Sequence, residues 1–417
     1  MTRRGWRQVR PILRALIRHK TSAVLIVLQV ALTLAVVSNA MFIVATRVVH
    51  LSRPTGTDEA NIFAIVNQWP AGEKPEAIAA RMRGDLAALR ELPGVHDAFA
   101  SEAYPLEGGM GVLAGLKLAP EQTNKPQFGI MYFADEHAIE TFGTHLIAGR
   151  NFRAEEVIAL GPFDTTAAPV IIVTSSLAHK LFPATSALGK TVYLTDGPAN
   201  IIGIVDSLQG PYAGSTTRSI DEDSVLYPAR SADPAMGTVY IVRARPGAIA
   251  EAIPPAIAAL WGQSEKRLID PETGVVTLAQ AREQGYAIDR SVALMMGMVS
   301  VLLLLATGAG IVGLSSFWVS QRRRQIGIRR ALGASRADIL AYFQTENLLL
   351  VTAGIFAGGI LAYAGNLQLM KAYELNLMPW YIVPCAAATL WLLGQSAVYG
   401  PARRAVNTAP VEAIRKR

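Results

Sequence analysis

The segment of this chain most similar to a reaction site is ATSALGKT, residues 184–191, which ends in the Gly-Lys-Thr of a phosphate-binding loop. Such a loop also needs a glycine at its start, so that backbone N–H groups can surround a phosphate, and Ala184 stands there instead. The segment follows a predicted helix and Pro183 rather than a buried strand. We therefore do not expect it to bind a nucleotide.

Other groupings of reactive residue types are equally weak. The six histidines are scattered, and the loose group of Asp135, His137 and His145 does not have the spacing of zinc ligands, so we expect these three side chains to face solvent. The sequence has no G-x-S-x-G nucleophile elbow and no apolar run that ends in paired carboxylates. We expect no catalytic residue, metal or cofactor in this chain; if ATP drives it, a partner chain binds ATP and Mg.

A different pattern occupies Gln321 to Leu350, between two long apolar segments. Arginines alternate there with apolar residues, so a short amphipathic helix can lie against lipid or protein while its guanidinium groups meet water, phosphates or carboxylates. Gly327 and Gly333 leave room for close approach of another surface. Gly333 is also a plausible helix stop before a new start at Ser335.

The composition indicates a membrane protein with a large soluble part. The chain is 51% hydrophobic with a mean hydropathy of +0.29, which is too apolar for a soluble protein and too charged for a wholly embedded one. Four apolar segments are long enough to span a bilayer, at residues 23–46, 289–318, 346–370 and 380–400. The single cysteine, Cys385, lies in the last of these, so no intrachain disulfide is possible.

The basic residues give these spans an orientation. Eighteen Lys and Arg residues, against two acidic residues, fall in an amphipathic N-terminal helix at 1–22, a coupling loop at 319–345 and a tail at 401–417. The positive-inside rule places these segments and both termini in the cytoplasm, with a short outer loop at 371–379. Membrane topology thus accounts for the net charge of +7, and we expect lipid rather than nucleic acid as a partner.

Several small or polar residues lie within the spans. The first span contains the polar residues Gln29, Thr33, Ser38 and Asn39. Their side chains either face other helices or are mildly polar groups that the membrane tolerates, and the sequence leaves both interpretations open. Candidate residues for helix packing or dimerisation are Gly310, Gly313, Gly354 and Gly358, the last two in a G-x-x-x-G arrangement.

Residues 47–288 alternate between strand and helix patterns, which predicts an α+β domain in two subdomains. The expected strands are 59–69, 94–104, 127–134, 170–173, 238–244 and 274–278, with a hairpin-like region at 191–205. The expected helices are 74–92, 135–142, 175–182 and 248–260. The fold class is therefore four transmembrane helices with a large α+β extracytoplasmic domain between the first and second.

The pattern R-x-x-Q-I-G-I-R-x-A-L-G-A-S-x-x-D-I resembles the cytoplasmic loop of FtsX-like ABC transporter permeases of the MacB type. In that family an ATPase subunit pushes on this loop. The family usually has Glu where this chain has Gln325. The positions to which the resemblance assigns ATPase coupling are Arg322, Gln325, Ile326, Gly327, Ile328, Arg329, Ala331, Leu332, Gly333 and Ala334.

Further segments resemble the same family. FGTHLIAGRNF at 142–152, the segment at 169–191 and IIGIVD at 201–206 are similar to its periplasmic core domain, and PARRAVNTAPVEAIRKR at 401–417 is similar to its closing sequence. Together the resemblance extends over nearly the entire chain.

The resemblance implies a permease subunit in the bacterial inner membrane, without an ATPase domain in this chain. It would pair with a second permease copy or a paralogue as a homo- or heterodimer, and with a separate ABC ATPase. It would transmit ATP-driven motion to the periplasmic domain, a mechanism called mechanotransmission. A tripartite efflux system with a periplasmic adaptor and an outer-membrane channel is the first interpretation, and a lipoprotein-releasing permease is the alternative.

Two interpretations from other classes are a membrane-anchored sensor and a periplasmic enzyme. A sensor should carry a folded cytoplasmic output domain, which we do not expect from the 17-residue tail. An enzyme should carry a catalytic constellation, and the residue patterns above do not supply one.

Overall fold

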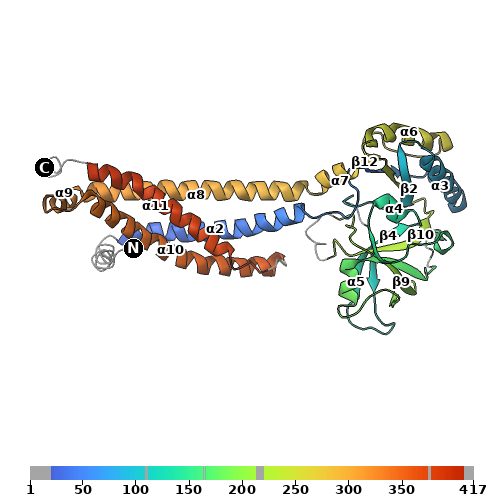
Figure 1. Cartoon of the computed structure of the whole chain (residues 1–417), viewed down its shortest axis with the longest axis horizontal. Coiled ribbons are helices and arrows are strands. Elements are labelled where there is room, and N and C mark those ends of the chain that lie inside the picture. Colours follow the sequence, from blue (N-terminus) through green and yellow to red (C-terminus); the bar gives the residue numbers. More distant parts are fainter. Residues whose placement is uncertain are drawn as a thin grey trace. The chain divides into compact units, whose positions relative to one another are not determined.

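The computed structural model describes residues 20–108, 111–162, 164, 166–212, 220–373 and 377–407 (Figure 1). These residues form two compact units: a helical unit of residues 20–52 and 289–407, and an α+β unit of residues 53–288. The amphipathic helix predicted at 1–22 lies, except for its last three residues, outside the described part of the chain.

Four long helices and one short helix form the described part of the helical unit. They are α2 (Lys20–Leu51), α8 (Ala287–Gln321), α9 (Arg323–Ala331), α10 (Arg336–Tyr373) and α11 (Ile382–Asn407). The four long ones are apolar enough to cross a membrane. They are also longer than the spans predicted from the sequence. α2 continues to Leu51, α10 includes the end of the predicted coupling loop, and α11 continues through Pro401 into the predicted tail.

Helices α2 and α10 approach each other closely at two glycines. A Cβ added to Gly354 would lie 2.7 Å from the Cβ of Val30, and one added to Gly358 would lie 2.7 Å from the carbonyl oxygen of Ala31. Helices approach this closely only where side-chain bulk is missing from one of them. The G-x-x-x-G face of α10 is therefore occupied by α2 of the same chain.

Polar side chains of α2 add hydrogen bonds to its neighbours. The Thr33 and Thr307 hydroxyls are 2.7 Å apart and join α2 to α8. Asn39 Nδ2 donates to the carbonyl oxygen of Ala362 in α10 at 3.1 Å. Polar groups in hydrocarbon must find partners inside the protein, so at these two positions the helix-facing interpretation is confirmed.

Eighteen shorter elements make up the described residues of the α+β unit. In chain order they are β1 (Ile62–Asn67), α3 (Pro75–Arg90), β2 (Val95–Ser101), β3 (Val112–Leu116), β4 (Gln127–Ala134), α4 (Ala138–Phe142), β5 (Leu146–Gly149), the 3-10 turn η1 (Ala154–Glu156), β6 (Ile158–Leu160), β7 (Val170–Thr174), α5 (Ser175–Leu181), β8 (Thr191–Tyr193), β9 (Pro198–Val205), β10 (Ser224–Ser231), β11 (Thr238–Ala244), α6 (Ile249–Gln263), β12 (Val275–Thr277) and α7 (Leu278–Gly285).

The first sheet has the order β12-β1-β11-β2 and is antiparallel throughout. Helices α3 and α6 cover one of its faces, where Phe63 and Ile65 of β1 share an apolar core with Leu86 of α3 and Leu260 of α6. The two-residue alternation of β1 and the helical spacing of α3 direct these side chains to the same layer.

The second sheet has the order β3-β4-β10-β7-β9-β5, with β6 beside β10 and β8 beside β9. Leu177 and Leu181 of α5 pack into its core. The sequence patterns missed β10, although it is central, because Pro228 and Arg230 interrupt its apolar run and proline is uncommon in central strands. Parallel pairing with β4 and antiparallel pairing with β7 supply the context that its local sequence lacks.

The two sheets are joined by a buried carboxylate and an aromatic cluster. Asp135, fully buried after β4, accepts hydrogen bonds from Arg230 of β10 at 2.9 Å and from Arg90 of α3 at 3.5 Å. The Phe142 ring lies 4.9 Å from Phe99 of β2 and 5.7 Å from Tyr132 of β4. The expectation that Asp135 faces solvent is therefore wrong, because two arginines from different subdomains compensate its burial.

Two carboxyl groups with shifted acidity lie in the loop after β2. Burial raises the pKa of Glu102 well above its usual value, and nearby backbone N–H groups oppose this only in part. Burial also raises the pKa of Glu107 to about 7. Both groups therefore favour their neutral forms more than an exposed glutamate does.

Because the pKa values of Glu102 and Glu107 are raised, we expect the folding stability of the chain to fall as the pH rises. A carboxyl with a raised pKa holds its proton in the folded state after the unfolded chain has released it, so stability falls between about pH 4.5 and the raised value. For Glu107 the loss should be about 2 kcal/mol, after allowance for solvent screening of a partly exposed group. The free energy of unfolding, measured with urea on the detergent-solubilised chain, should change less between pH 5 and 8 for Glu107→Gln than for the native protein.

Glu156→Gln is the matched control for this measurement. In the native chain an ion pair with Arg150 lowers the pKa of Glu156 to about 2. The contribution of this ion pair to folding stability is therefore lost only as the pH falls below about 4.5. Equal slopes for the native chain and Glu107→Gln between pH 5 and 8 would contradict the prediction.

Candidate functional site

The turn between α9 and α10 is built on Gly333 and Ser335. Gly333 has a φ of +94°, a backbone conformation that other residues rarely adopt, and it follows the last turn of α9. Ser335 then caps α10: its hydroxyl accepts from the Asp338 N–H at 3.2 Å, while the Asp338 carboxylate accepts from the Ser335 N–H at 3.0 Å. The helix stop and new start predicted from the sequence are both present.

Ile326 and Gly327 form the inner face of α9. Ile326 is 8% exposed and belongs to one apolar cluster with Trp318 of α8 and with Ile339 and Phe343 of α10. Gly327 is also buried. These two positions hold α9 against the long helices, and their side chains are not available to a partner.

The opposite face of α9 is exposed and has an i, i+3, i+4, i+7 spacing. We call Gln325, Ile328, Arg329 and Leu332 the outer stripe, because this spacing places them along one side of a helix. The Ile328 side chain is 47% exposed and that of Leu332 is 83% exposed. Two exposed aliphatic side chains beside an arginine make a contact surface in which Gln325, the residue that departs from the expected Glu, also lies.

A buried ion pair anchors the start of this region. Arg322 Nη1 donates to both carboxylate oxygens of Glu346 in α10 at 3.0 Å, and the Glu346 side chain is 2% exposed. The Arg322 guanidinium also lies 6.0 Å from the Trp318 ring, and the Arg329 guanidinium lies 4.9 Å from the Tyr342 ring. These contacts tie the segment after α8 directly to α10.

The predicted coupling residues therefore divide into different roles. Arg322 is an anchor, Ile326 and Gly327 are internal, and four others form the outer stripe. Gly333 is in the turn and Ala334 is partly buried beside it. Ala331 is the last residue of α9, and its side chain lies outside the described part of the chain.

Sequence reasoning missed Glu346 as the partner of Arg322. A lone carboxylate inside the apolar run at the start of the third span was a usable signal, because an acid at such a position needs a buried partner. The sequence alone did not indicate which arginine supplies it.

The predicted packing glycines also divide. Gly354 and Gly358 contact α2, and a Cβ added to Gly310 would lie 2.5 Å from Gln29 Oε1, also in α2. A Cβ added to Gly313 would meet no atom within 4 Å. Three of the four positions thus pack within the chain, and Gly313 leaves an open surface on α8.

The segment at 184–191 forms a turn between α5 and β8 whose backbone N–H groups are already engaged. Gly189 N–H donates to the Ile201 carbonyl at 2.8 Å and Lys190 N–H to the Ala187 carbonyl at 3.1 Å. These groups do not converge on a site for phosphate. Within the described residues, no group of three or more His, Cys, Asp or Glu residues is placed to hold a metal ion.

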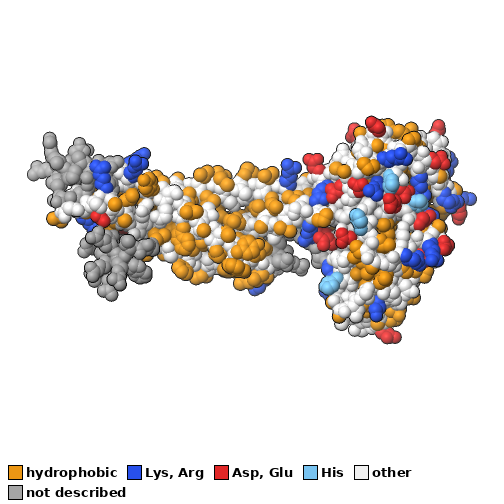
Figure 2. All heavy atoms as spheres, viewed as in Figure 1, with side chains coloured by type: hydrophobic (Ala, Val, Ile, Leu, Met, Phe, Trp, Pro, Cys, Tyr) orange, Lys and Arg blue, Asp and Glu red, His pale blue; other side chains and the backbone are white. Residues whose placement is uncertain are grey.

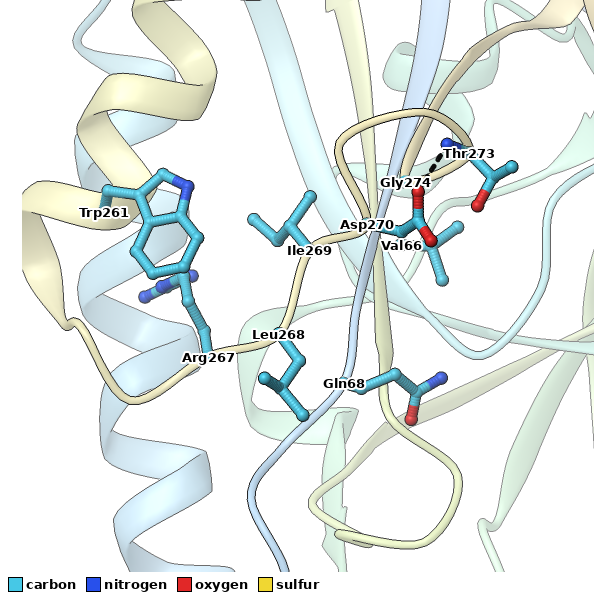
Figure 3. Close-up of a pocket in the computed structure, with 9 residues that line it drawn as sticks. All are labelled: Val66, Gln68, Trp261, Arg267, Leu268, Ile269, Asp270, Thr273 and Gly274. Atoms are coloured by element: carbon cyan, nitrogen blue, oxygen red, sulfur yellow. Dashed lines mark hydrogen bonds between the residues drawn. The ribbon is translucent and has the colours of Figure 1, made fainter.

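A hollow of about 490 Å³ opens at the edge of the first sheet, between the end of α6 and the loop before β12 (Figure 3). Trp261, Leu268 and Ile269 supply its apolar walls, and Gln68 and Asp270 lie on its rim. Asp270 Oδ1 accepts from the Thr273 N–H at 2.9 Å, which closes the turn.

Comparison with known families matches both parts of the chain. A family model described as a MacB-like periplasmic core domain matches residues 25–260, and one described as an FtsX-like permease C-terminal region matches residues 297–410. Together they cover most of α2, the α+β unit into α6, and the helices from within α8 to the end of α11.

Curated relatives agree with these matches. The pyoverdine export ATP-binding/permease protein PvdT of Pseudomonas savastanoi pv. phaseolicola is 26% identical over 369 residues, which are 85% of this chain and 51% of that protein. The ABC transporter permease YknZ of Bacillus subtilis is 27% identical over 254 residues, 58% of this chain and 61% of that one. The chain thus spans roughly half the length of the relatives it matches.

Two solved structures are also similar. The periplasmic region of MacB from Actinobacillus actinomycetemcomitans has a TM-score of 0.33 at 13% identity and covers 56% of this chain and 96% of that one. The extracellular domain of YknZ from Gram-positive bacteria has a TM-score of 0.31 at 18% identity and covers 50% and 99%, respectively.

The buried ion pair predicts a large loss of stability when one partner is neutralised. Glu346→Gln leaves Arg322 without its counter-charge in a buried position, so the free energy of unfolding should fall by about 3 kcal/mol. Unfolding of the full chain in mixed micelles measures this loss. Arg403→Gln, which removes one exposed charge from the same unit, should change it by less than about 0.5 kcal/mol. Similar losses in the two variants would show that the pair has no special role.

Proposed function

Because the chain belongs to the FtsX-like ABC transporter permeases with a MacB-like periplasmic core domain, we propose that it transmits ATP-driven motion from a separate ATPase subunit to that domain. The chain itself is a non-catalytic permease, and the partner ATPase binds the ATP and Mg. The observation that carries this proposal is the division of α9 into a fixed inner face and an exposed outer stripe.

The outer stripe is suited to docking another protein. Its aliphatic side chains Ile328 and Leu332 are exposed, while Ile326 on the inner face anchors the helix in the apolar cluster. A partner that presses on the stripe would therefore move α9 together with the helices that hold it, because little of the applied motion is lost in a loose loop.

Motion applied to α9 has two routes into the long helices. The Arg322–Glu346 pair and the Ile326 contacts connect it to α10, and α8 ends directly before it in the chain. α8 is a continuous helix of 35 residues that begins where the α+β unit ends. A helix transmits displacement along its axis as a stiff element, so α8 is the direct connection between the proposed docking site and the periplasmic domain.

We propose further that α8 contacts a second permease, either an identical chain or a paralogue. In the most apolar window of α8 only 11% of the residues are buried within the chain, against 44% for α2. Gly313 lies on this open surface. The face of the helical unit seen in Figure 2 carries mainly hydrophobic side chains, so both lipid and a second copy can cover it.

Orientation and pathway complete the proposal. The arginine-rich segment at α9 and both termini face the cytoplasm, and the membrane is the bacterial inner membrane. The proposed pathway is export through a tripartite system with a periplasmic adaptor and an outer-membrane channel; the relatives named for pyoverdine and macrolide export support the export direction. Lipoprotein release remains the alternative within the family.

The docking proposal predicts that Leu332→Asp weakens binding of the ABC ATPase at least about tenfold, because a charge replaces an exposed aliphatic anchor. Co-purification from native membranes in mild detergent, followed by mass spectrometry, identifies the ATPase, and titration with the purified subunit measures its affinity. Leu268→Asp, at an aliphatic residue of the α+β unit that is 61% exposed, is the matched control and should bind normally. Normal binding by both Leu332→Asp and Ile328→Asp would exclude the outer stripe as the docking site.

The dimer proposal predicts different outcomes for two glycines. Gly313→Leu should leave unfolding unchanged but weaken self-association in micelles by roughly tenfold, because its side chain enters the proposed interface. Gly358→Leu should instead destabilise the fold by about 2 kcal/mol, because the new side chain meets α2. Single-molecule or cross-linking measurements of dimer fraction test the first effect. Undiminished association of Gly313→Leu would place the interface elsewhere.

A further inference from the structure

A second buried group of charged side chains joins the other end of α8 to α2. Asp289, in the first turn of α8, accepts a hydrogen bond from Arg47 Nη1 through Oδ1. Its Oδ2 lies 2.8 Å from His50 Nδ1, in the last turn of α2. The side chains of His50 and Asp289 are 4% and 6% exposed, and that of Arg47 is 18% exposed. We call these three residues the domain-side clamp.

Helix polarity favours this arrangement. The C-terminal end of a helix carries a partial negative charge and its N-terminal end a partial positive charge. Arg47 and His50 lie at the C-terminal end of α2, and Asp289 lies at the N-terminal end of α8. The charges of Arg47 and Asp289 are therefore each stabilised by their own helix and by each other across the helix contact.

Away from the clamp, α2 and α8 share an apolar cluster and a few polar contacts, all nearer α9. Nearer α9, α2 and α8 are joined by the Thr33–Thr307 hydroxyl pair and by Gln29 Nε2, which donates to the Ala306 carbonyl at 3.2 Å. Most of the apolar window of α8 is not buried within the chain. The ends of the two helices next to residues 53–288 thus depend on Asp289 for their common position.

We propose that Asp289 is a positioning residue that locks the domain-side ends of α2 and α8 together, so that the α+β unit is driven through both of its chain connections at once. The proposal rests on the transmission function above for its purpose, but the lock itself is a property of the helical unit. Without it, displacement of α8 would move one connection to the domain while α2 stayed with α10.

Spin labels measure the lock directly in the full chain. Val49→Cys and Ser291→Cys, both at exposed positions, report the domain-side ends, and Cys385→Ser removes the chain's own cysteine. In detergent or nanodiscs, Asp289→Asn should broaden and lengthen the distance distribution between these labels, whereas Asp289→Glu should largely preserve it. A control pair at Leu28→Cys and Leu305→Cys should not change in either variant, which shows that the protein remains folded. An unchanged distribution for Asp289→Asn would overturn the lock.

A second readout tests its purpose. In proteoliposomes with the partner ATPase, Asp289→Asn should still bind the ATPase and hydrolyse ATP, but transport should fall by roughly fivefold or more. Broadened distances with full transport would overturn the positioning role. Absence of any ATPase binding to the native chain would instead refute the proposed function while the distance measurement still decides the lock.

Discussion

Two buried ion pairs position the ends of α8, a helix whose most apolar window is only 11% buried within the chain. Glu346 holds the segment that follows α8, through Arg322, and Asp289 holds the first turn of α8 against α2. An ionisable group beside an apolar environment is costly unless it is paired. Each pair therefore favours one arrangement of its helices strongly over the alternatives.

The contrast between α8 and α2 follows from this constraint. α2 is held by close contacts along its length, since Gly354 and Gly358 of α10 admit its backbone. α8 is held by polar contacts at a few levels and by Ile311, Trp318 and Val319, which belong to an apolar cluster with side chains of α2 and α10, and most of its apolar window is not buried. α2 and α10 therefore pack closely together, whereas most residues in the apolar window of α8 are not buried within the chain.

In the α+β unit, too, a few long-range contacts join the parts. Asp135 accepts hydrogen bonds from Arg230 in the second sheet and from Arg90 in α3, which covers the first sheet, and the rings of Phe99, Phe142 and Tyr132 contact one another. Glu102 and Glu107, whose pKa values are raised, lie in the loop that leaves the first sheet for the second. A unit joined in this manner can respond to motion of its two chain connections as a whole.

The sequence by itself determined the four apolar helices, most elements of the α+β unit, and the end of α9 at Gly333, because periodicity, capping residues and glycine conformations act over a few residues. It also carried the resemblance to a permease family, since those motifs are contiguous. Only the tertiary structure decided which coupling residues face inward and that Gly354 and Gly358 of α10 pack against α2. It also decided that Glu346 pairs with Arg322 and Asp289 with Arg47. The central strand β10 belongs to the same group, since its pairing partners overrule a proline in its own sequence. These contacts join residues far apart in the chain, and local physical preferences do not distinguish among the possible partners.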